Sequence, residues 1–177
     1  MNAHDTLIAR NRDYAAAYRG GRPALEPKLR TVVLCCADHR ADPAHVLGLE
    51  PNEAIVLRNP GGRLTQAVLH ELAVLATIGA LEGVAAAFEL VLMQHTDCGM
   101  SHLSAIDHAD LLATMFGINP TDVAARHIDD PTKAVVTDVE LLRSNLLMPR
   151  DLVVSGLVYD VDTGKVATII APAPLGS

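Results

Sequence analysis

Short apolar runs alternate with helical patterns along much of the chain. The run Thr31-Val-Val-Leu-Cys-Cys36 is rich in β-branched residues and predicts a buried strand. Residues 54–57 predict a second strand and residues 87–93 a third. The third run is nearly continuous in apolar residues, as in parallel strands that are buried on both faces. Strands that alternate with helices predict an α/β fold, with a mostly parallel central sheet flanked by helices.

The helix predicted after the second strand is apolar on most of its faces. Its main stripe repeats at helical spacing through Leu64, Val68, Leu72 and Leu75. Gly79 is placed to end this helix. Because apolar residues also occupy most of the remaining faces, we expect the helix to be buried on both sides, at a subunit interface.

A second long helix is predicted in the last third of the chain. Asp130 is expected to cap it, with Pro131 at the first helical position. Its apolar stripe consists of Val135, Val139, Leu142 and Leu146, and Pro149 is expected to close the helix. Residues 152–160 and 165–170 flank a turn and predict a terminal β-hairpin, which adds an antiparallel edge strand at the C-terminus.

The remaining segments lie outside the alternating pattern. Residues 100–129 are irregular and acidic, and predict a surface excursion with one short helix near 110–116. Residues 1–28 predict an N-terminal helical arm, and residues 29–177 the α/β core. Because no repeat, low-complexity tract or break in composition divides the chain, we expect a single domain over residues 1–177.

The composition argues against several classes of partner. The chain has 177 residues, a net charge of −7 with histidine neutral, and only 3% aromatic residues. Negative charge and scarce stacking surfaces argue against nucleic acid and anionic membranes. The first residues show no secretory signal, and the longest uncharged apolar run is too short for a membrane span. We therefore expect a cytoplasmic protein, in which three cysteines serve better as metal ligands or core residues than as a disulfide framework.

Soft metal ligands follow two of the predicted strands. Cys36 ends the first strand, and His95 and Cys98 come directly after the third. The carboxyl ends of parallel strands meet at one edge of a sheet, where sites gather. Two thiolates and an imidazole form a zinc set, and three protein ligands leave the fourth position open, as in catalytic sites. The sequence therefore predicts one Zn²⁺ per chain, held by Cys36, His95 and Cys98.

An acid and an arginine follow the first of these ligands. Asp38 can bond to a metal-bound hydroxide, and Arg40 can pair with Asp38 and keep it ionised. A purely structural ion pair is the alternative. Beside a metal we favour the catalytic role, because perturbed acids gather at functional sites.

The order of these motifs resembles the β-carbonic anhydrases, in particular their small bacterial members. Cys36-Ala-Asp-His-Arg40 is similar to the Cys-x-Asp-x-Arg motif of that family, and His95-Thr-Asp-Cys98 to its His-x-x-Cys motif. Between them, Arg58-Asn-Pro-Gly-Gly62 is similar to the Arg-Asn-Ala-Gly loop of the family. Each motif alone is weak, but three in order, each after a predicted strand, are a specific signal.

The resemblance implies reversible hydration of CO2 to bicarbonate and a proton by a zinc-bound hydroxide. Asp38 would orient the hydroxide and Arg40 would orient Asp38. In some family members the aspartate instead leaves the arginine and takes the fourth zinc position. The resemblance also implies a homodimer or tetramer, in which the N-terminal helix embraces a neighbouring copy.

Two positions depart from the pattern of the family. His39 stands between Asp38 and Arg40, where the family usually has a small residue. Its ring could crowd the pair, shuttle protons or point away. Pro60 replaces the small alanine of the loop and has no amide donor. If a substrate or a neighbouring loop needed that N–H group, activity would suffer.

Other functions remain open at the level of sequence. A hydrolase of carbonyl sulfide or carbon disulfide would use the same fold and the same zinc chemistry. A catalytically degenerate homologue would bind zinc or bicarbonate without turnover. His39 could replace His95 as a ligand, which would strand His95. A thiol redox role for Cys35 and Cys36 is disfavoured, because neighbouring residues of a strand face opposite ways.

The histidines of the excursion pose a separate question. His102, His108 and His127 lie near acidic residues in the sequence. A second metal site is conceivable there, but a solvated polar loop is the plainer interpretation.

Overall fold

The computed structural model describes residues 2–84, 88–127 and 129–177 and contains a five-stranded sheet. The strands are β1 (Thr31–Cys36), β2 (Ala54–Asn59), β3 (Glu89–His95), β4 (Val153–Tyr159) and β5 (Val166–Pro174), in the spatial order β2-β1-β3-β4-β5. The first four run parallel, and β5 pairs antiparallel with β4 at the edge. The predicted α/β fold, with its antiparallel C-terminal strand, is confirmed. The predicted third strand began at Ala87, which lies outside the described residues.

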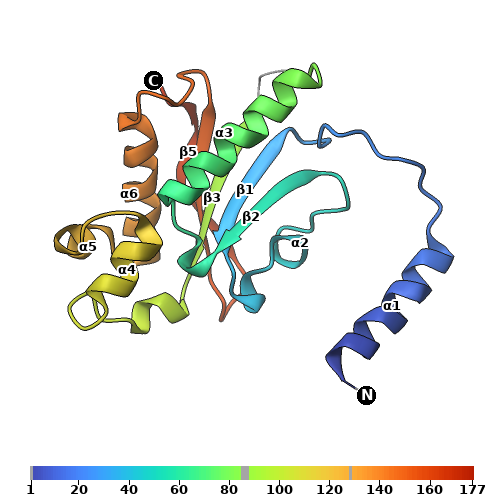
Figure 1. Cartoon of the computed structure of the whole chain (residues 1–177), viewed down its shortest axis with the longest axis horizontal. Helices are drawn as coiled ribbons and strands as arrows, with labels where there is room; N and C mark the ends of the chain where they lie inside the picture. Colours follow the sequence, from blue (N-terminus) through green and yellow to red (C-terminus); the bar gives the residue numbers. More distant parts are fainter. Residues whose placement is uncertain (1, 85–87, 128) are drawn as a thin grey trace.

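Six α-helices and four 3₁₀ turns surround the sheet in the described part of the chain (Figure 1). The α-helices are α1 (Ala3–Ala17), α2 (Pro43–Val46), α3 (Gln66–Leu81), α4 (Ala109–Phe116), α5 (Val123–Arg126) and α6 (Pro131–Ser144). The 3₁₀ turns are η1 (His39–Ala41), η2 (Pro60–Gly62), η3 (Gly99–His102) and η4 (Pro120–Asp122). None of the described helices is both long enough and apolar enough to cross a membrane.

The two faces of the sheet are covered unequally. On one face, Val68 of α3 and Val139 and Leu142 of α6 pack with alternate residues of the central strands, such as Leu34 and Leu92. The opposite face carries the smaller buried cluster of Val33, Cys35 and Met93, against which the chain just after α2 packs. Helix α1 contributes no buried residue, and Figure 1 shows it standing apart from the sheet. The main core therefore lies between the sheet and the pair α3 and α6.

Helix α3 extends beyond the predicted stop. Gly79 lies inside the helix, which runs to Leu81, and Gly83 takes the left-handed conformation at φ 68°. The prediction at Gly79 was wrong because a glycine inside a helix costs only about 1 kcal/mol, whereas the left-handed residue that ends a helix favours glycine strongly. Within one chain only Val68 of this helix is buried, and Val74 is 58% exposed.

Helix α6 begins as predicted but ends early. The Asp130 carboxylate accepts hydrogen bonds from the amides of Thr132 and Lys133, as expected of a cap. The helix ends at Ser144, so Leu146, which was assigned to its apolar stripe, lies beyond it and is 93% exposed. The prediction of the last turn was therefore wrong, because an apolar residue at helical spacing extends a helix only where another part of the fold packs against it.

The excursion contains more structure than the one predicted helix. Helix α4 matches that prediction, and η3, η4 and α5 add three further turns. Leu112, Ala113, Phe116 and Val123 form a separate small core there. The acidic composition of this segment hid these buried residues, which are spaced irregularly in the sequence.

Gly156 of β4 tests how tightly α6 packs on the sheet. A Cβ atom at this position would lie 2.2 Å from Cγ1 of Val135 in α6. Gly156→Ala is therefore expected to lower the free energy of unfolding by about 1–3 kcal/mol, measured by urea denaturation. Val135→Ala should relieve the clash, so the double variant should lose less than the sum of the single losses. Additive losses would contradict this packing.

Candidate metal centre

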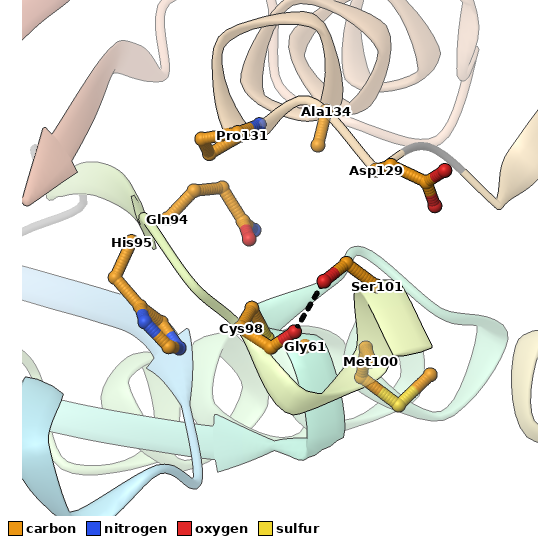
Figure 2. Close-up of a pocket in the computed structure, with 9 residues that line it drawn as sticks. All are labelled: Gly61, Gln94, His95, Cys98, Met100, Ser101, Asp129, Pro131 and Ala134. Carbon is orange, nitrogen blue, oxygen red and sulfur yellow. Dashed lines mark hydrogen bonds between the residues drawn. The ribbon is translucent and has the colours of Figure 1, made fainter. Parts of the chain in front are cut away.

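The predicted ligands converge at the carboxyl edge of the sheet. Cys36 ends β1 and His95 ends the neighbouring β3. Cys98 lies in the loop that follows β3, three residues after His95. One ligand atom from each residue lies within 4.8 Å of the other two, and the two sulfurs are 3.7 Å apart. Figure 2 shows His95 and Cys98 at the end of β3, with Gly61 close by. In the described part of the chain, no other cluster of histidine, cysteine and acidic residues shares this geometry.

The hydrogen bonding of His95 leaves one ring nitrogen free for a metal. Its Nδ1 lies 2.8 Å from the carbonyl oxygen of Thr96. Because a carbonyl only accepts, Nδ1 carries the proton, and Nε2 of the neutral ring has a lone pair. The residue is only 1% exposed, and this buried Nε2 has no hydrogen-bond partner. A buried polar atom without a partner is costly, and a metal ion would satisfy it.

Backbone amides favour the thiolate form of Cys36. The amides of Asp38 and Gly61 lie 3.4 and 3.3 Å from its sulfur. The Cys98 thiol lowers the pKa of Cys36 most, and His95 and the two amides lower it further against the opposing effect of burial. The pKa of Cys98 is raised correspondingly, because the two thiols share one proton. Thiolates are the form that binds metals, so this environment prepares the Cys36 sulfur for a metal ion.

A close backbone approach holds the loop of η2 against Cys36. Gly62 has φ 59°, and a Cβ atom there would lie 2.5 Å from the backbone nitrogen of Cys36. Nε2 of Gln94 donates to the carbonyl of Gly62 at 2.7 Å and fixes the other side of the loop. The amide that reaches the Cys36 sulfur belongs to Gly61, so the missing N–H of Pro60 removes no bond to this ligand.

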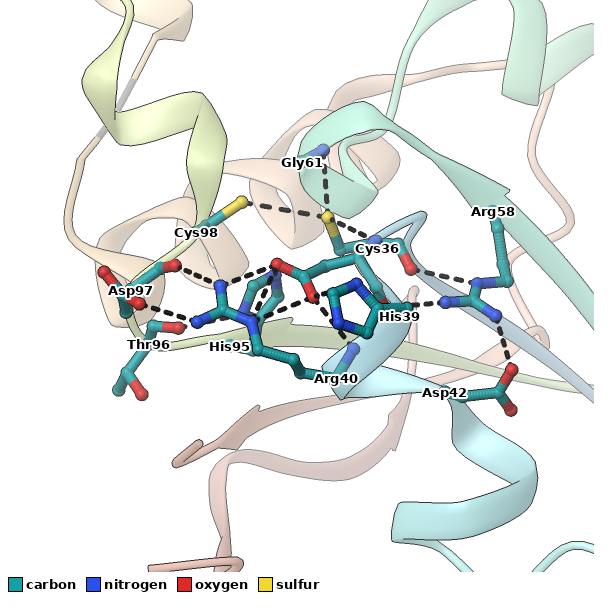
Figure 3. Close-up of polar contacts among 11 residues, drawn as sticks. Cys36, His39, Arg40, Asp42, Arg58, Gly61, His95, Thr96, Asp97 and Cys98 are labelled. Atoms are coloured by element: carbon teal, nitrogen blue, oxygen red, sulfur yellow. Dashed lines mark hydrogen bonds and ion pairs between the residues drawn. The ribbon is translucent and has the colours of Figure 1, made fainter. Parts of the chain in front are cut away.

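The predicted acid and arginine form a close ion pair (Figure 3). Nη2 and Nε of Arg40 donate to the Asp38 carboxylate at 2.7 and 3.1 Å, and the Arg40 amide donates to the same group at 2.9 Å. These hydrogen bonds from Arg40 hold the pKa of Asp38 well below its usual range. Oδ2 of Asp38 lies 4.0 Å from Nε2 of His95. An ionised carboxylate therefore stands directly beside the candidate ligands.

Arg58 supports the Cys36 loop in a way that the sequence did not indicate. Its Nε donates to the carbonyl of Cys36 at 3.0 Å and its Nη2 to the carbonyl of Asp38 at 2.8 Å. Its Nη1 pairs with Asp42 at 2.6 Å. The only sequence signal for this role was the place of Arg58 in the loop motif, and that motif does not indicate which groups Arg58 binds. Asp97, also unassigned from the sequence, pairs with Arg40 at 2.7 Å.

The remaining polar candidates lie outside the metal cluster. The His39 side chain is 94% exposed, and its Nδ1 lies 3.8 Å from Oδ1 of Asp38, so the ring stands beside the ion pair on the solvent side and does not join the ligands. Cys35 is buried on the opposite face of β1, and burial raises the pKa of its thiol to about 12. His127 lies 3.3 Å from Asp129, but the histidines of the excursion do not gather into a metal cluster within the described residues.

A small cavity adjoins the ligands on the side of α6. Figure 2 shows the Gln94 side chain pointing into it, beneath Pro131 and Ala134. Its volume is about 20 Å³, which is enough for about one water molecule.

Comparison with known proteins assigns the chain to a family. A family model described as carbonic anhydrase matches residues 31–166. The chain belongs to the β-class carbonic anhydrase family. β-Carbonic anhydrase 1 of Mycobacterium bovis is 30% identical over 165 residues, which cover 93% of this chain and 96% of that protein. The crystal structure of a carbonic anhydrase from Streptococcus mutans superposes with a TM-score of 0.76 at 31% identity, covering 96% of this chain and 98% of that one.

The chain is also similar to a protein with a different named activity. A carbon disulfide hydrolase of an Acidianus strain is 26% identical over 185 residues, covering 91% of this chain and 86% of that protein. Membership of the β-carbonic anhydrase family therefore leaves more than one small substrate open.

Gly62→Ala tests the contact of the η2 loop with Cys36. Gly164 is the matched control, because it also has a left-handed φ of 70° but open space around its Cβ position. Gly164→Ala should cost about 1–2 kcal/mol of unfolding free energy from the backbone alone. Gly62→Ala should cost about 1–3 kcal/mol more and reduce bound zinc, measured by denaturation and metal analysis. Equal losses in both variants would contradict the contact.

Proposed function

We propose that this protein is a zinc-dependent carbonic anhydrase, which reversibly hydrates CO2 to bicarbonate and a proton. One Zn²⁺ per chain would be held by Cys36, His95 and Cys98. The unpartnered Nε2 of His95, which faces two sulfurs beside an ionised carboxylate, carries this proposal. When bound there, zinc supplies the chemistry that lowers the pKa of a water molecule from about 15.7 to about 7. We place the protein in the cytoplasm, where reducing conditions keep its three cysteines free.

Asp38 would act on the reacting water. An ionised carboxylate only accepts hydrogen bonds, so it can hold the O–H group of the water and leave the oxygen lone pair directed at CO2. Arg40 would hold Asp38 in that role, because its Nε donates to Oδ1 and its Nη2 to Oδ2 of the carboxylate. The proton released would pass to buffer in solution.

The second candidate is hydrolysis of carbon disulfide or carbonyl sulfide. The similarity to a carbon disulfide hydrolase over 91% of this chain supports it. The same ligands, Asp38 and Arg40 would serve, because these groups act on the water and not on the electrophile. A zinc-binding homologue without turnover is the remaining alternative.

The surface of a single chain supports self-association. Helix α1 has 15 residues and buries none of them, and its Leu7 and Tyr14 are 61% and 57% exposed. An isolated helix of this length is marginal in water. The exposed Val74 of α3 and Val56 of β2 also present apolar surface. We therefore propose a homodimer, or a tetramer built from it, in which α1 of one copy packs on the other.

Stopped-flow CO2 hydration tests the activity. On protein of known zinc content, kcat/KM should rise with pH from about pH 6.5 to about pH 9, as the reacting water loses its proton near pH 7. Asp38→Ala should lower it by about 100-fold, and Cys98→Ser should lower both zinc content and activity. Carbon disulfide and carbonyl sulfide assays run in parallel separate the candidates. One zinc per chain with no CO2 hydration at any pH would contradict the proposal.

Charge placed on α1 tests the assembly. Leu7→Glu with Tyr14→Glu should shift the protein towards monomer in sedimentation velocity, because charged groups would enter the apolar contact. Arg12→Glu introduces the same residue on the opposite side of the helix and should leave the assembly intact. A wild-type protein that is monomeric at every concentration would contradict this contact.

A further inference from the structure

Arg40 lies between two carboxylates, and only one of them belongs to the family motif. Its Nη1 pairs with Oδ2 of Asp97 at 2.7 Å, and its Nη2 donates to the carbonyl of Asp97 at 2.8 Å. On the other side, Nε and Nη2 bind the carboxylate of Asp38. Figure 3 shows the guanidinium spanning the gap towards Asp97. All three nitrogens of the fork are therefore engaged.

Asp97 occupies a defined position between two candidate metal ligands. It stands between His95 and Cys98 and takes the left-handed conformation, with φ 51°. Aspartate is among the few residues with a side chain that tolerate this conformation. Arg40 follows Cys36 on the other ligand loop, so its contact with Asp97 ties together the two loops that carry the ligands.

We propose that Asp97 is a positioning residue, which fixes the Arg40 guanidinium so that Arg40 holds the Asp38 carboxylate beside the metal. The inference rests on the proposed zinc function. Its physical basis is the fixed planar fork of arginine. With Nη1 and one hydrogen of Nη2 held by Asp97, the edge that carries Nε faces Asp38. Without the Asp97 carboxylate, Nη1 of Arg40 would lose its partner, and on that side only the Asp97 carbonyl would still hold this 40% exposed side chain.

A role in stability alone accounts poorly for this contact. The Asp97 side chain is 61% exposed, and exposed ion pairs contribute only about 0–1 kcal/mol. The contact also brings a second negative charge towards Asp38. Repulsion between the two carboxylates opposes the folded state, so this arrangement adds little to stability. Its benefit is geometric, because it restricts the one side chain that binds both oxygens of Asp38.

The two informative substitutions keep the left-handed backbone. Asp97→Asn keeps size and conformation but removes the charge, and Asp97→Gly removes the side chain. Both should lower kcat/KM for CO2 hydration by about 10-fold to 100-fold, as expected when a residue that supports a metal site is lost. The midpoint of urea unfolding should stay close to that of the wild type. Glu26→Gln removes a carboxylate 2.6 Å from Arg30, away from the site, and serves as the matched control with unchanged kcat/KM.

A double-mutant cycle separates action through Arg40 from direct action on the ligand loop. In an Arg40→Ala background, Asp97→Asn should change kcat/KM by less than about twofold, because its route of action is already gone. The same 10-fold or greater loss in that background would overturn the inference. Wild-type activity in both single variants would overturn it as well.

A spectroscopic readout keeps this test independent of turnover. The Nε–H resonance of Arg40 in ¹⁵N-labelled zinc protein should exchange with solvent faster in Asp97→Asn and Asp97→Gly than in the wild type. If the wild type does not hydrate CO2, the proposed function fails, but this resonance still decides the inference. Unchanged exchange in both variants would show that Asp97 does not hold Arg40.

Discussion

The parallel pairing of β1 with β3 is the constraint on which the site depends. Their register, from Thr31 opposite Glu89 to Cys35 opposite Met93, ends both strands at the same edge of the sheet, where the ligand atoms of Cys36 and His95 lie within 4.8 Å of each other. Each residue advances a strand by about 3.3 Å, so a slip in this register would move His95 along the sheet and away from Cys36. The buried apolar residues of both strands prevent such a slip, because it would expose them to water. The same packing that stabilises the sheet therefore sets the spacing of the ligands.

Around this edge, charge is arranged in two arginine-centred clusters. Arg58 binds two carbonyls of the loop that follows β1 and is balanced by Asp42. Arg40 binds the Asp38 side chain and is balanced by Asp97. The first cluster fixes the backbone and the second fixes the carboxylate. Asp38 thus stays ionised and oriented with little reorganisation, which is what a group acting on a reacting water needs.

The sequence predicts those parts of the molecule whose signals are local. Apolar runs located the strands, and the residue types at their ends identified Cys36, His95 and Cys98. Asp97 and Asp42 escaped notice because an acid becomes informative only when the fold brings an arginine to it. Gly79 and Leu146 were misassigned for a related reason: spacing alone does not say where tertiary packing stops. The roles proposed for Asp38 and Arg40, to orient the reacting water and to hold that carboxylate, come from the resemblance to the family.

In the proposed reaction these groups act on water, and this limits which substrates they can discriminate. Cys36, His95, Cys98 and Asp38 would prepare the same nucleophile for CO2 as for carbon disulfide, since both are small linear electrophiles. The cavity that His95 and Cys98 line on the side of α6 holds only about 20 Å³. Under the proposed function, selectivity between such substrates would therefore depend on the approach to the site rather than on the metal ligands themselves.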